Sequence, residues 1–230
     1  MSRETRQTEL LFHRRGGWRK GAGRKPKVPG RPGVSHRRRM RFSSARAFHI
    51  TVRMCSEVAN LRGYRMFPVV RRVFCRTAQG RRFRIVHYSV QGNHIHFIIE
   101  ASDRAALTAG MRRVGIQLAL QINRAMGRKK GRVLADRYHQ EYLQTPTQVR
   151  NAVSYVLCNA RRHAWKSSGR VLAAGWLDPY SSSAWFDGWS GRAPPRWPKQ
   201  GDPVAAPKTW LVRRRWRTLG LISINSVPGR

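Results

Sequence analysis

The chain has 230 residues, of which 47 are Lys or Arg and 10 are Asp or Glu, so its formal net charge is +37. A fold with this charge is expected to bind a polyanion, and nucleic acid is the default partner, because each neutralised phosphate releases condensed counterions. No apolar run approaches the roughly 20 residues of a membrane span, and we expect no signal peptide, since the first residues lack an apolar core. Cys55, Cys75 and Cys158 are scattered and odd in number, which argues against a disulfide framework. They indicate a reducing compartment, so we expect a cytoplasmic, nucleoid-associated protein.

Residues 1–46 have the composition of a basic arm. They hold 15 Lys and Arg residues, two acidic residues and several turns rich in glycine and proline. Such a segment buries too little apolar surface to order itself. The stretch around Arg24, Lys25 and Lys27 is typical of an extended arm that lies in a narrow minor groove of DNA. A purely electrostatic tail is the alternative, and both interpretations stay open.

A globular pattern follows, which we assign to a domain at residues 47–165. Apolar and polar residues alternate over 48–54, which predicts a strand, and residues 59–79 favour a helix in which Pro68 would cause a kink or a split. Residues 83–90 and 94–100 alternate again on either side of the tight turn 91–93. This pair of segments predicts a β-hairpin.

The second half of this domain predicts two helices separated by a strand. Residues 103–126 form an amphipathic helix that stops at Gly127, and residues 133–144 favour a strand. Thr145 then provides an N-cap, Pro146 the first helical residue and Gln148 the end of a capping box, so a helix should run to about Ala164. The order of elements predicts an α+β fold with an antiparallel sheet.

Residues 166–230 are rich in Trp, Pro, Gly and Ser and show weak periodicity. They predict a C-terminal extension that wraps the core or enlarges a DNA-binding surface. Its tryptophans, notably Trp185, Trp189 and Trp197, could stack on unpaired bases. Clamping the extension to the core is at least as good an interpretation.

Two histidines on the predicted return strand are candidate metal ligands. Alternate side chains of a strand share one face, so His94 and His96 point the same way with Cβ atoms about 7 Å apart, whereas Ile95 faces the core. Imidazole pairs suit ions such as Zn²⁺ and Mn²⁺, and they can hold Mg²⁺ when the other ligands are oxygens. His49 and His139 are further histidines of the sheet for which an ordinary polar role is the simpler interpretation.

Tyr155 lies on the last predicted helix of the domain, about 120° away from the middle of its apolar stripe. It shares that flank with Asn159 one turn later, and Arg162 lies nearby. A half-exposed surface tyrosine is the alternative. Tyr138 and Tyr142 are other possible nucleophiles, but tyrosines in strands usually serve packing.

Together these residues suit phosphoryl transfer. A tyrosine oxygen can attack a DNA phosphate and conserve the bond energy in a phosphotyrosine, while a metal polarises the phosphate. Asn159 could add an oxygen ligand. The sequence shows no carboxylate pair of the kind that two-metal nucleases use, since Glu100, Asp103, Asp136 and Glu141 are scattered.

The motifs are similar to those of a known family. Residues 92–100, GNHIHFIIE, resemble the histidine–hydrophobic–histidine motif of the single-tyrosine HUH transposases, which include insertion-sequence and REP-associated enzymes. Residues 136–139 and 155–163 resemble the closing strand and catalytic helix of that family. The motif order, the 59-residue separation of His96 and Tyr155 and the amide four residues after the tyrosine all agree. Many family members carry Gln at the position of Asn159.

The resemblance implies an RRM-like or ferredoxin-like antiparallel sheet with helices packed on one face. It also implies Tyr155 as nucleophile, a divalent metal, Mg²⁺ or Mn²⁺, held by His94, His96 and Asn159, and single-stranded DNA with hairpin or palindromic elements as substrate. Arg137 and Arg162 are expected to contact DNA, and a homodimer is possible. The alternatives are a catalytically silent DNA- or RNA-binding regulator on the same fold and a replication-initiator or relaxase-like enzyme, which the short core disfavours.

Overall fold

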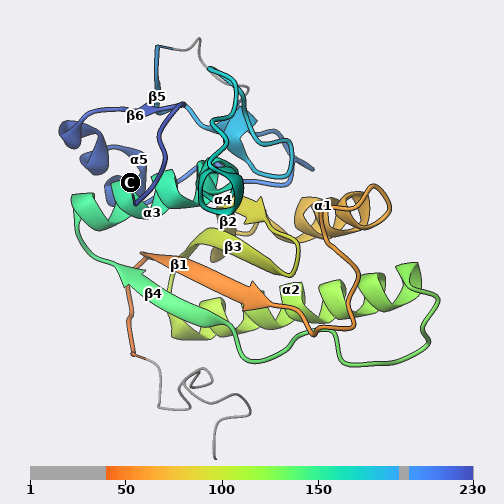
Figure 1. The fold of residues 1–230 in the computed structure, drawn as a ribbon. Helices are drawn as coiled ribbons and strands as arrows, with labels where there is room; N and C mark the ends of the chain where they lie inside the picture. Colours follow the sequence, from red (N-terminus) through yellow and green to blue (C-terminus); the bar gives the residue numbers. More distant parts are fainter. Residues whose placement is uncertain (1–39, 192–196, 230) are drawn as a thin grey trace, which may run out of the picture. The chain divides into compact units, whose positions relative to one another are not determined.

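The computed structural model describes residues 40–191 and 197–229. The arm residues Arg24, Lys25 and Lys27 therefore lie outside the described residues. The predicted domain contains four strands and four helices, shown in Figure 1: β1 (Arg46–Arg53), α1 (Met66–Thr77), β2 (Phe83–Val90), β3 (His94–Ala101), α2 (Arg104–Ala125), β4 (His139–Leu143), α3 (Pro146–Leu157) and α4 (Asn159–Ser168).

The four strands form one antiparallel sheet in the order β2-β3-β1-β4. This order, with α1 between β1 and β2 and α2 between β3 and β4, is that of the ferredoxin-like βαββαβ motif. The predicted α+β class and antiparallel sheet are therefore confirmed. The register pairs Thr51 of β1 with His96 of β3, and Arg53 with His94.

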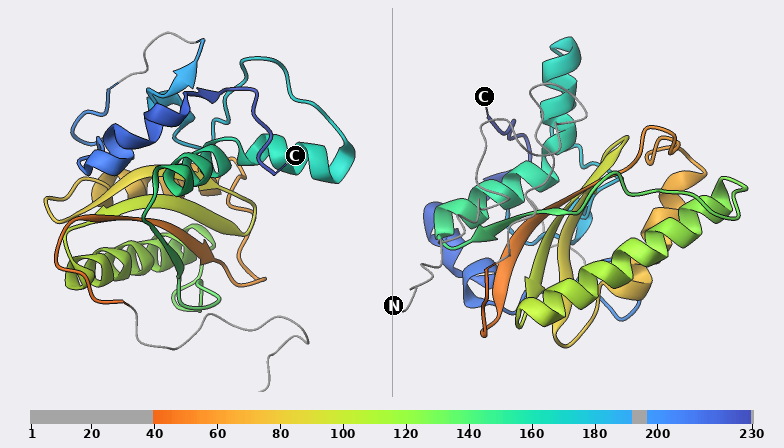
Figure 2. Two further views of the ribbon diagram at one scale, coloured as in Figure 1. Left: turned by 90° about the vertical axis from the view of Figure 1, so that its left-hand side faces the viewer. Right: turned by 90° about the horizontal axis from the view of Figure 1, so that it is seen from below.

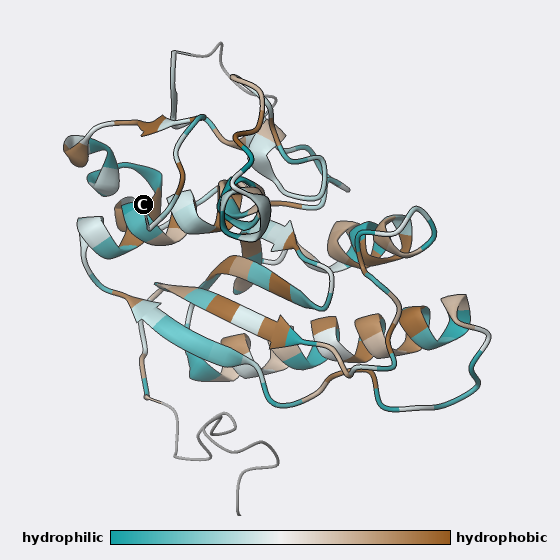
Figure 3. Cartoon of the chain, in the orientation of Figure 1, coloured by the Kyte–Doolittle hydropathy of each residue, from teal (hydrophilic) through white to brown (hydrophobic). Residues whose placement is uncertain are grey.

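One face of the sheet is covered by α1 and α2, and the main apolar core lies between this face and the two helices (Figure 2). Phe48 and Ile50 from β1, and Phe97 and Ile99 from β3, are completely buried there. Figure 3 shows the apolar and hydrophilic positions that alternate along β1. This alternation leaves His49, Thr51 and the two histidines of β3 on the opposite face.

The opposite face is partly covered by α3, which makes a second apolar cluster with Val86, Ile98, Trp189 and Trp216. Helices therefore lie on both faces of the sheet, whereas the resemblance implied helices on one face only. The capping box at Thr145 is present: its hydroxyl accepts a hydrogen bond from the backbone N–H of Gln148, whose side chain accepts one from the N–H of Thr145.

Two helix boundaries differ from the expectation. α1 begins at Met66 rather than near residue 59, which places Pro68 in the first turn, where its missing N–H costs nothing. The helix expected to run from Pro146 to Ala164 is interrupted at Cys158, and α4 begins at Asn159.

The C-terminal extension adds the short elements β5 (Trp189–Ser190), α5 (Trp210–Arg213) and β6 (Ile222–Ser223). It covers the free edge of β2, because Val90 donates a backbone hydrogen bond to Tyr180, Ser182 donates one to Tyr88 and Ala205 donates one to Ile85. An exposed strand edge is thereby protected. No helix in the described ranges is both long and apolar enough for a membrane crossing.

Candidate active site

His94 and His96 share the face of β3 that looks toward α3. Their ring centroids are 4.8 Å apart and the rings are perpendicular. Ile95, between them, is completely buried on the other face. The strand alternation that the sequence indicated therefore holds, and it brings two imidazoles close enough to share one cation.

Hydrogen bonds fix how both imidazoles are oriented. Nδ1 of His94 lies 2.8 Å from Oδ1 of Asn93, the residue before it. Nδ1 of His96 lies 3.1 Å from Oγ1 of Thr51 and 3.2 Å from Nε2 of His49, both on the neighbouring strand. Holding one ring nitrogen in this way selects the other, Nε2, as the nitrogen available for a ligand.

Both histidines are neutral at physiological pH. Burial, followed by the nearby Arg53 and His163, lowers the pKa of His94 from 6.5 to about 4. Burial, followed by the neighbouring His49, His94, His163 and Arg53, lowers the pKa of His96 to about 2. A neutral imidazole keeps the lone pair that binds a metal ion, so the site favours the form that can act as a ligand.

Tyr155 on α3 reaches the same histidines. Its ring centroid lies 5.1 Å from that of His96, nearly perpendicular to it, and 5.8 Å from that of His49. The Arg162 guanidinium carbon lies 5.1 Å from the centre of the tyrosine ring. Tyr155 also lines an open cavity of about 550 Å³ together with His49, Asn151 and Arg162. The phenol is thus half-buried beside the histidines and next to a cation.

The other possible nucleophiles face away from this site. Tyr138 and Tyr142 pack against the core under α1 and α2. The ring of Tyr142 lies 5.5 Å from that of Phe48 on that side of the sheet. Of the three tyrosines that the sequence singled out, Tyr155 is the one that the fold brings to the histidines.

Asn159 is completely buried at the start of α4, and neither its Oδ1 nor its Nδ2 has a hydrogen-bond partner among the described residues. Tyr155, four residues before it, contacts His96. His163, four residues after it, has its ring 6.4 Å from that of His94. The amide therefore lies on a stretch of helix that contacts the histidine pair at both ends.

The polar atoms present fit a cation. Nε2 of His96 is also buried without a hydrogen-bond partner in the described part of the chain, as are both amide atoms of Asn159. Unpaired buried polar atoms are costly, and a divalent ion would satisfy a nitrogen and an oxygen of this group. Within residues 40–191 and 197–229, no three His, Cys, Asp or Glu side chains gather in a way that could hold a metal. A site here would thus consist of two imidazoles and an amide.

Sequence reasoning undervalued His49 and did not consider Thr51. Both lie on the hydrophilic face of β1, and the contacts of Thr51 and His49 with His96 follow from the pairing of β1 with β3. The alternation along β1 was the signal that could have placed them. Arg137 is exposed in the segment before β4. Ala135 of that segment donates a backbone hydrogen bond to Arg53, which pairs with His94.

Comparisons with known proteins give two matches. Residues 43–157 match a family model described as IS200-like transposase. A solved structure of a REP-associated tyrosine transposase bound to a REP hairpin is similar, with 19% sequence identity, a TM-score of 0.49 and coverage of 65% of this chain and 82% of that one. No curated protein matches the chain.

Proposed function

Because the chain belongs to the family of IS200-like transposases, we propose that it cleaves and rejoins single-stranded DNA with Tyr155 as nucleophile. The tyrosine oxygen attacks the phosphorus of one phosphodiester and loses its proton to solvent. The bond from phosphorus to the 3′ oxygen breaks, the 3′ end takes up a proton and leaves as a hydroxyl, and the 5′ side stays attached as a phosphotyrosine. Attack by a 3′ hydroxyl on that linkage reverses the step and joins strands.

The observation that carries this proposal is the position of Tyr155. Its ring centroid lies 5.1 Å from that of His96, and the tyrosine lines an open cavity of about 550 Å³ that could receive a substrate. Arg162 is placed to attract a phosphate toward the phenol. A surface tyrosine without a function would have no reason to lie between a neutral histidine cluster and a guanidinium.

We propose His94, His96 and Asn159 as ligands of one divalent cation, Mg²⁺ or Mn²⁺. When bound, such an ion polarises the scissile phosphate and neutralises charge that develops on it. The protein supplies the orientation: Asn93 and Thr51 hold the two imidazoles, and burial keeps both neutral. Only Cys158 separates the helix that carries Tyr155 from Asn159, so the proposed nucleophile and the amide are four residues apart in the chain.

The proposed substrate is single-stranded DNA with hairpin or palindromic elements, as the family resemblance implies. Arg137 and Arg162 would contact its backbone near the site. The basic arm at residues 1–46, with Arg24, Lys25 and Lys27, would add affinity that is independent of sequence. Residues 47–165 would carry the chemistry and residues 166–230 would enlarge the binding surface.

A covalent-adduct assay tests this function. Protein is incubated with a pool of hairpin-bearing single strands and Mg²⁺ or Mn²⁺, and protein–DNA species are resolved on a denaturing gel. Tyr155→Phe should abolish the adduct and leave hairpin binding nearly intact. Tyr142→Phe is the matched control, because it removes a hydroxyl from the other side of the sheet, and it should keep the adduct. A wild-type protein that binds the strands without any adduct would instead be a silent regulator.

A further inference from the structure

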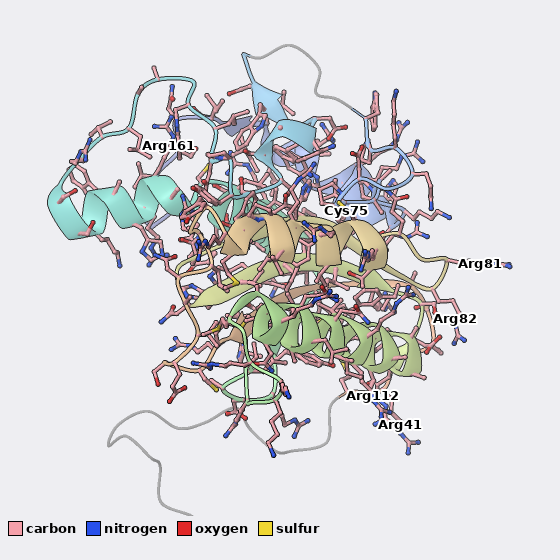
Figure 4. All side chains as sticks on the ribbon, turned by 90° about the vertical axis from the view of Figure 1, so that its right-hand side faces the viewer. Arg41, Cys75, Arg81, Arg82, Arg112 and Arg161 are labelled. Atoms are coloured by element: carbon pink, nitrogen blue, oxygen red, sulfur yellow. The ribbon has the colours of Figure 1, made fainter. Side chains whose placement is uncertain are left out.

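A basic cleft lies between the turn after α1, which is inside the matched range, and the C-terminal extension, which is outside it. Its volume is about 1010 Å³, and the described residues lining it include seven Arg and Lys side chains. Five of these are exposed to solvent: Arg81, Lys199, Lys208, Arg213 and Arg214. Figure 4 shows Arg81 projecting outward from the protein surface. The cleft is therefore a separate concentration of positive charge.

Little within the cleft neutralises this charge. Asp187 is the one carboxylate among the described lining residues, and it is already paired with Arg217. In the described ranges, no hydrogen bond or ion pair engages the side chains of the five exposed residues named above. Cations that line one cleft together create a positive potential that favours the binding of a polyanion. The absence of counter-charges points to a ligand that carries several phosphates.

Hydrogen bonds anchor the backbone of each wall of the cleft. Arg84 is buried and donates to the backbone carbonyls of Gly80 and Arg81, which fixes the turn. On the opposite wall, the buried carboxylate of Glu100 accepts hydrogen bonds from the backbone N–H groups of Lys208, at 2.7 Å, and Thr209, at 2.8 Å. The cationic side chains thus extend from anchored backbone rather than from loose ends.

Trp197 gives the cleft an aromatic surface. Its side chain is 62% exposed, whereas Trp189 and Trp216 from the same extension are buried and clamp the extension to α3. An exposed indole at the border of a basic groove is the combination that binds unpaired nucleic acid, because bases stack on the ring while cations hold the backbone. Duplex DNA keeps its bases stacked on one another and would not use Trp197 in this way.

The cleft is distinct from the proposed nucleophile site. Arg84 pairs with Glu100 across the β2–β3 hairpin, and His96 lies four residues before Glu100 on β3. At about 3.3 Å per residue, this separates the two places by about 13 Å along the strand. We propose that the cleft binds a single-stranded segment of DNA and anchors the substrate away from the scissile phosphate. The choice of DNA as the polyanion rests on the function proposed above.

Binding of a fluorescein-labelled oligothymidine to the full chain, measured by anisotropy across a salt series, tests the proposal. The cleft variant combines Arg81→Gln, Lys208→Gln and Arg214→Gln. The control variant combines Arg112→Gln, Arg124→Gln and Lys129→Gln, which removes the same charge from exposed positions in α2 and just after it. The cleft variant should lower the slope of log affinity against log salt by about 2, since each lost phosphate contact contributes about 0.7. The control variant should lower it by less than half as much.

Trp197→Ala supplies an independent readout. It should weaken oligothymidine binding about tenfold and leave the binding of a duplex of equal length unchanged. Equal slopes for the cleft and control variants would overturn the cleft as a site, and equal losses on single strands and duplex would overturn its preference for unpaired DNA. Neither measurement uses the chemistry of Tyr155. A protein without adduct but with these binding effects would therefore refute the cleavage proposal and retain the cleft.

Discussion

Asn159→Leu should stabilise the metal-free protein, although it removes a proposed functional residue. Asn159 is completely buried, and neither polar atom of its amide has a partner in the described residues. Leucine has the same number of heavy atoms and the same branch point, so it can fill the space without unpaired polar groups. Relieving such a group is worth about 1–3 kcal/mol, which corresponds to a Tm about 2–12 °C higher for a chain of this size.

The same variant should lose its response to metal. A ligand present at 100 times its Kd stabilises the protein that binds it by about 2.7 kcal/mol. Wild-type protein should therefore melt at a higher temperature in Mn²⁺ than in chelator, and Asn159→Leu should show a much smaller difference. Differential scanning calorimetry of both proteins in the two conditions measures these effects.

Asn123→Leu is the matched control. Asn123 is also a buried amide, and its Oδ1 likewise has no partner in the described residues, but its Nδ2 donates a 2.9 Å hydrogen bond to the Gly131 carbonyl. Its replacement breaks that hydrogen bond and leaves the carbonyl unpaired, so it should lower Tm in chelator. If Asn159→Leu lowers Tm in chelator to the same extent, the amide of Asn159 has satisfied hydrogen bonds in solution, and the reasoning that makes it a candidate ligand fails.

Three further predictions concern the proposed metal ligands, the basic arm and the anchoring of the C-terminal extension. His94→Ala and His96→Ala should each abolish adduct formation at any Mn²⁺ concentration, whereas Asn159→Ala should be milder and partly rescued by Mn²⁺. His94 is partly exposed, so its replacement should change Tm little, whereas replacing the buried His96 should also lower Tm. Normal cleavage by both His variants in chelator would exclude the metal site. Deleting residues 1–46, which hold 15 basic residues, should weaken DNA binding and lower its dependence on salt, while a saturating substrate should still be cleaved. An unchanged slope of log affinity against log salt would show that the arm does not bind DNA. Glu100→Gln should cost about 2–3 kcal/mol, because its new N–H groups would face the backbone donors of the extension, and should make the extension more sensitive to chymotrypsin. Unchanged stability and unchanged proteolysis would show that this carboxylate is not the anchor.

The sequence predicted those features that local chemistry determines. The alternation over residues 83–90 matches β2, and Thr145 and Gln148 form the expected capping box. The same alternation placed His94 and His96 on one face, because the period of a strand is independent of what it packs against. Tyr155 was placed off the apolar stripe of its helix, and it contacts His96.

Contacts between distant residues determine what the sequence did not predict. Nothing local marks the break at Cys158, but Arg161 just beyond it is buried and donates hydrogen bonds to the carbonyls of Leu172 and Ala173 in the following loop. The extension is held by pairs such as Arg62 and Asp178, whose two hydrogen bonds of 2.9 Å join residues 116 positions apart. Periodicity carries no information about such pairs, so the sequence did not distinguish the tryptophans that clamp the extension from the exposed Trp197 and Trp210.

Mapping the site of covalent attachment tests the central claim most directly. Wild-type protein is incubated with hairpin-bearing single strands, the DNA is digested to a nucleotide remnant, and tryptic peptides are analysed by mass spectrometry. The peptide 151–161 contains Tyr155 as its one tyrosine, whereas Tyr138 and Tyr142 share the peptide 138–150. We predict the remnant on Tyr155. A remnant on the peptide 138–150, or no remnant under conditions in which strands are cleaved, would contradict the account.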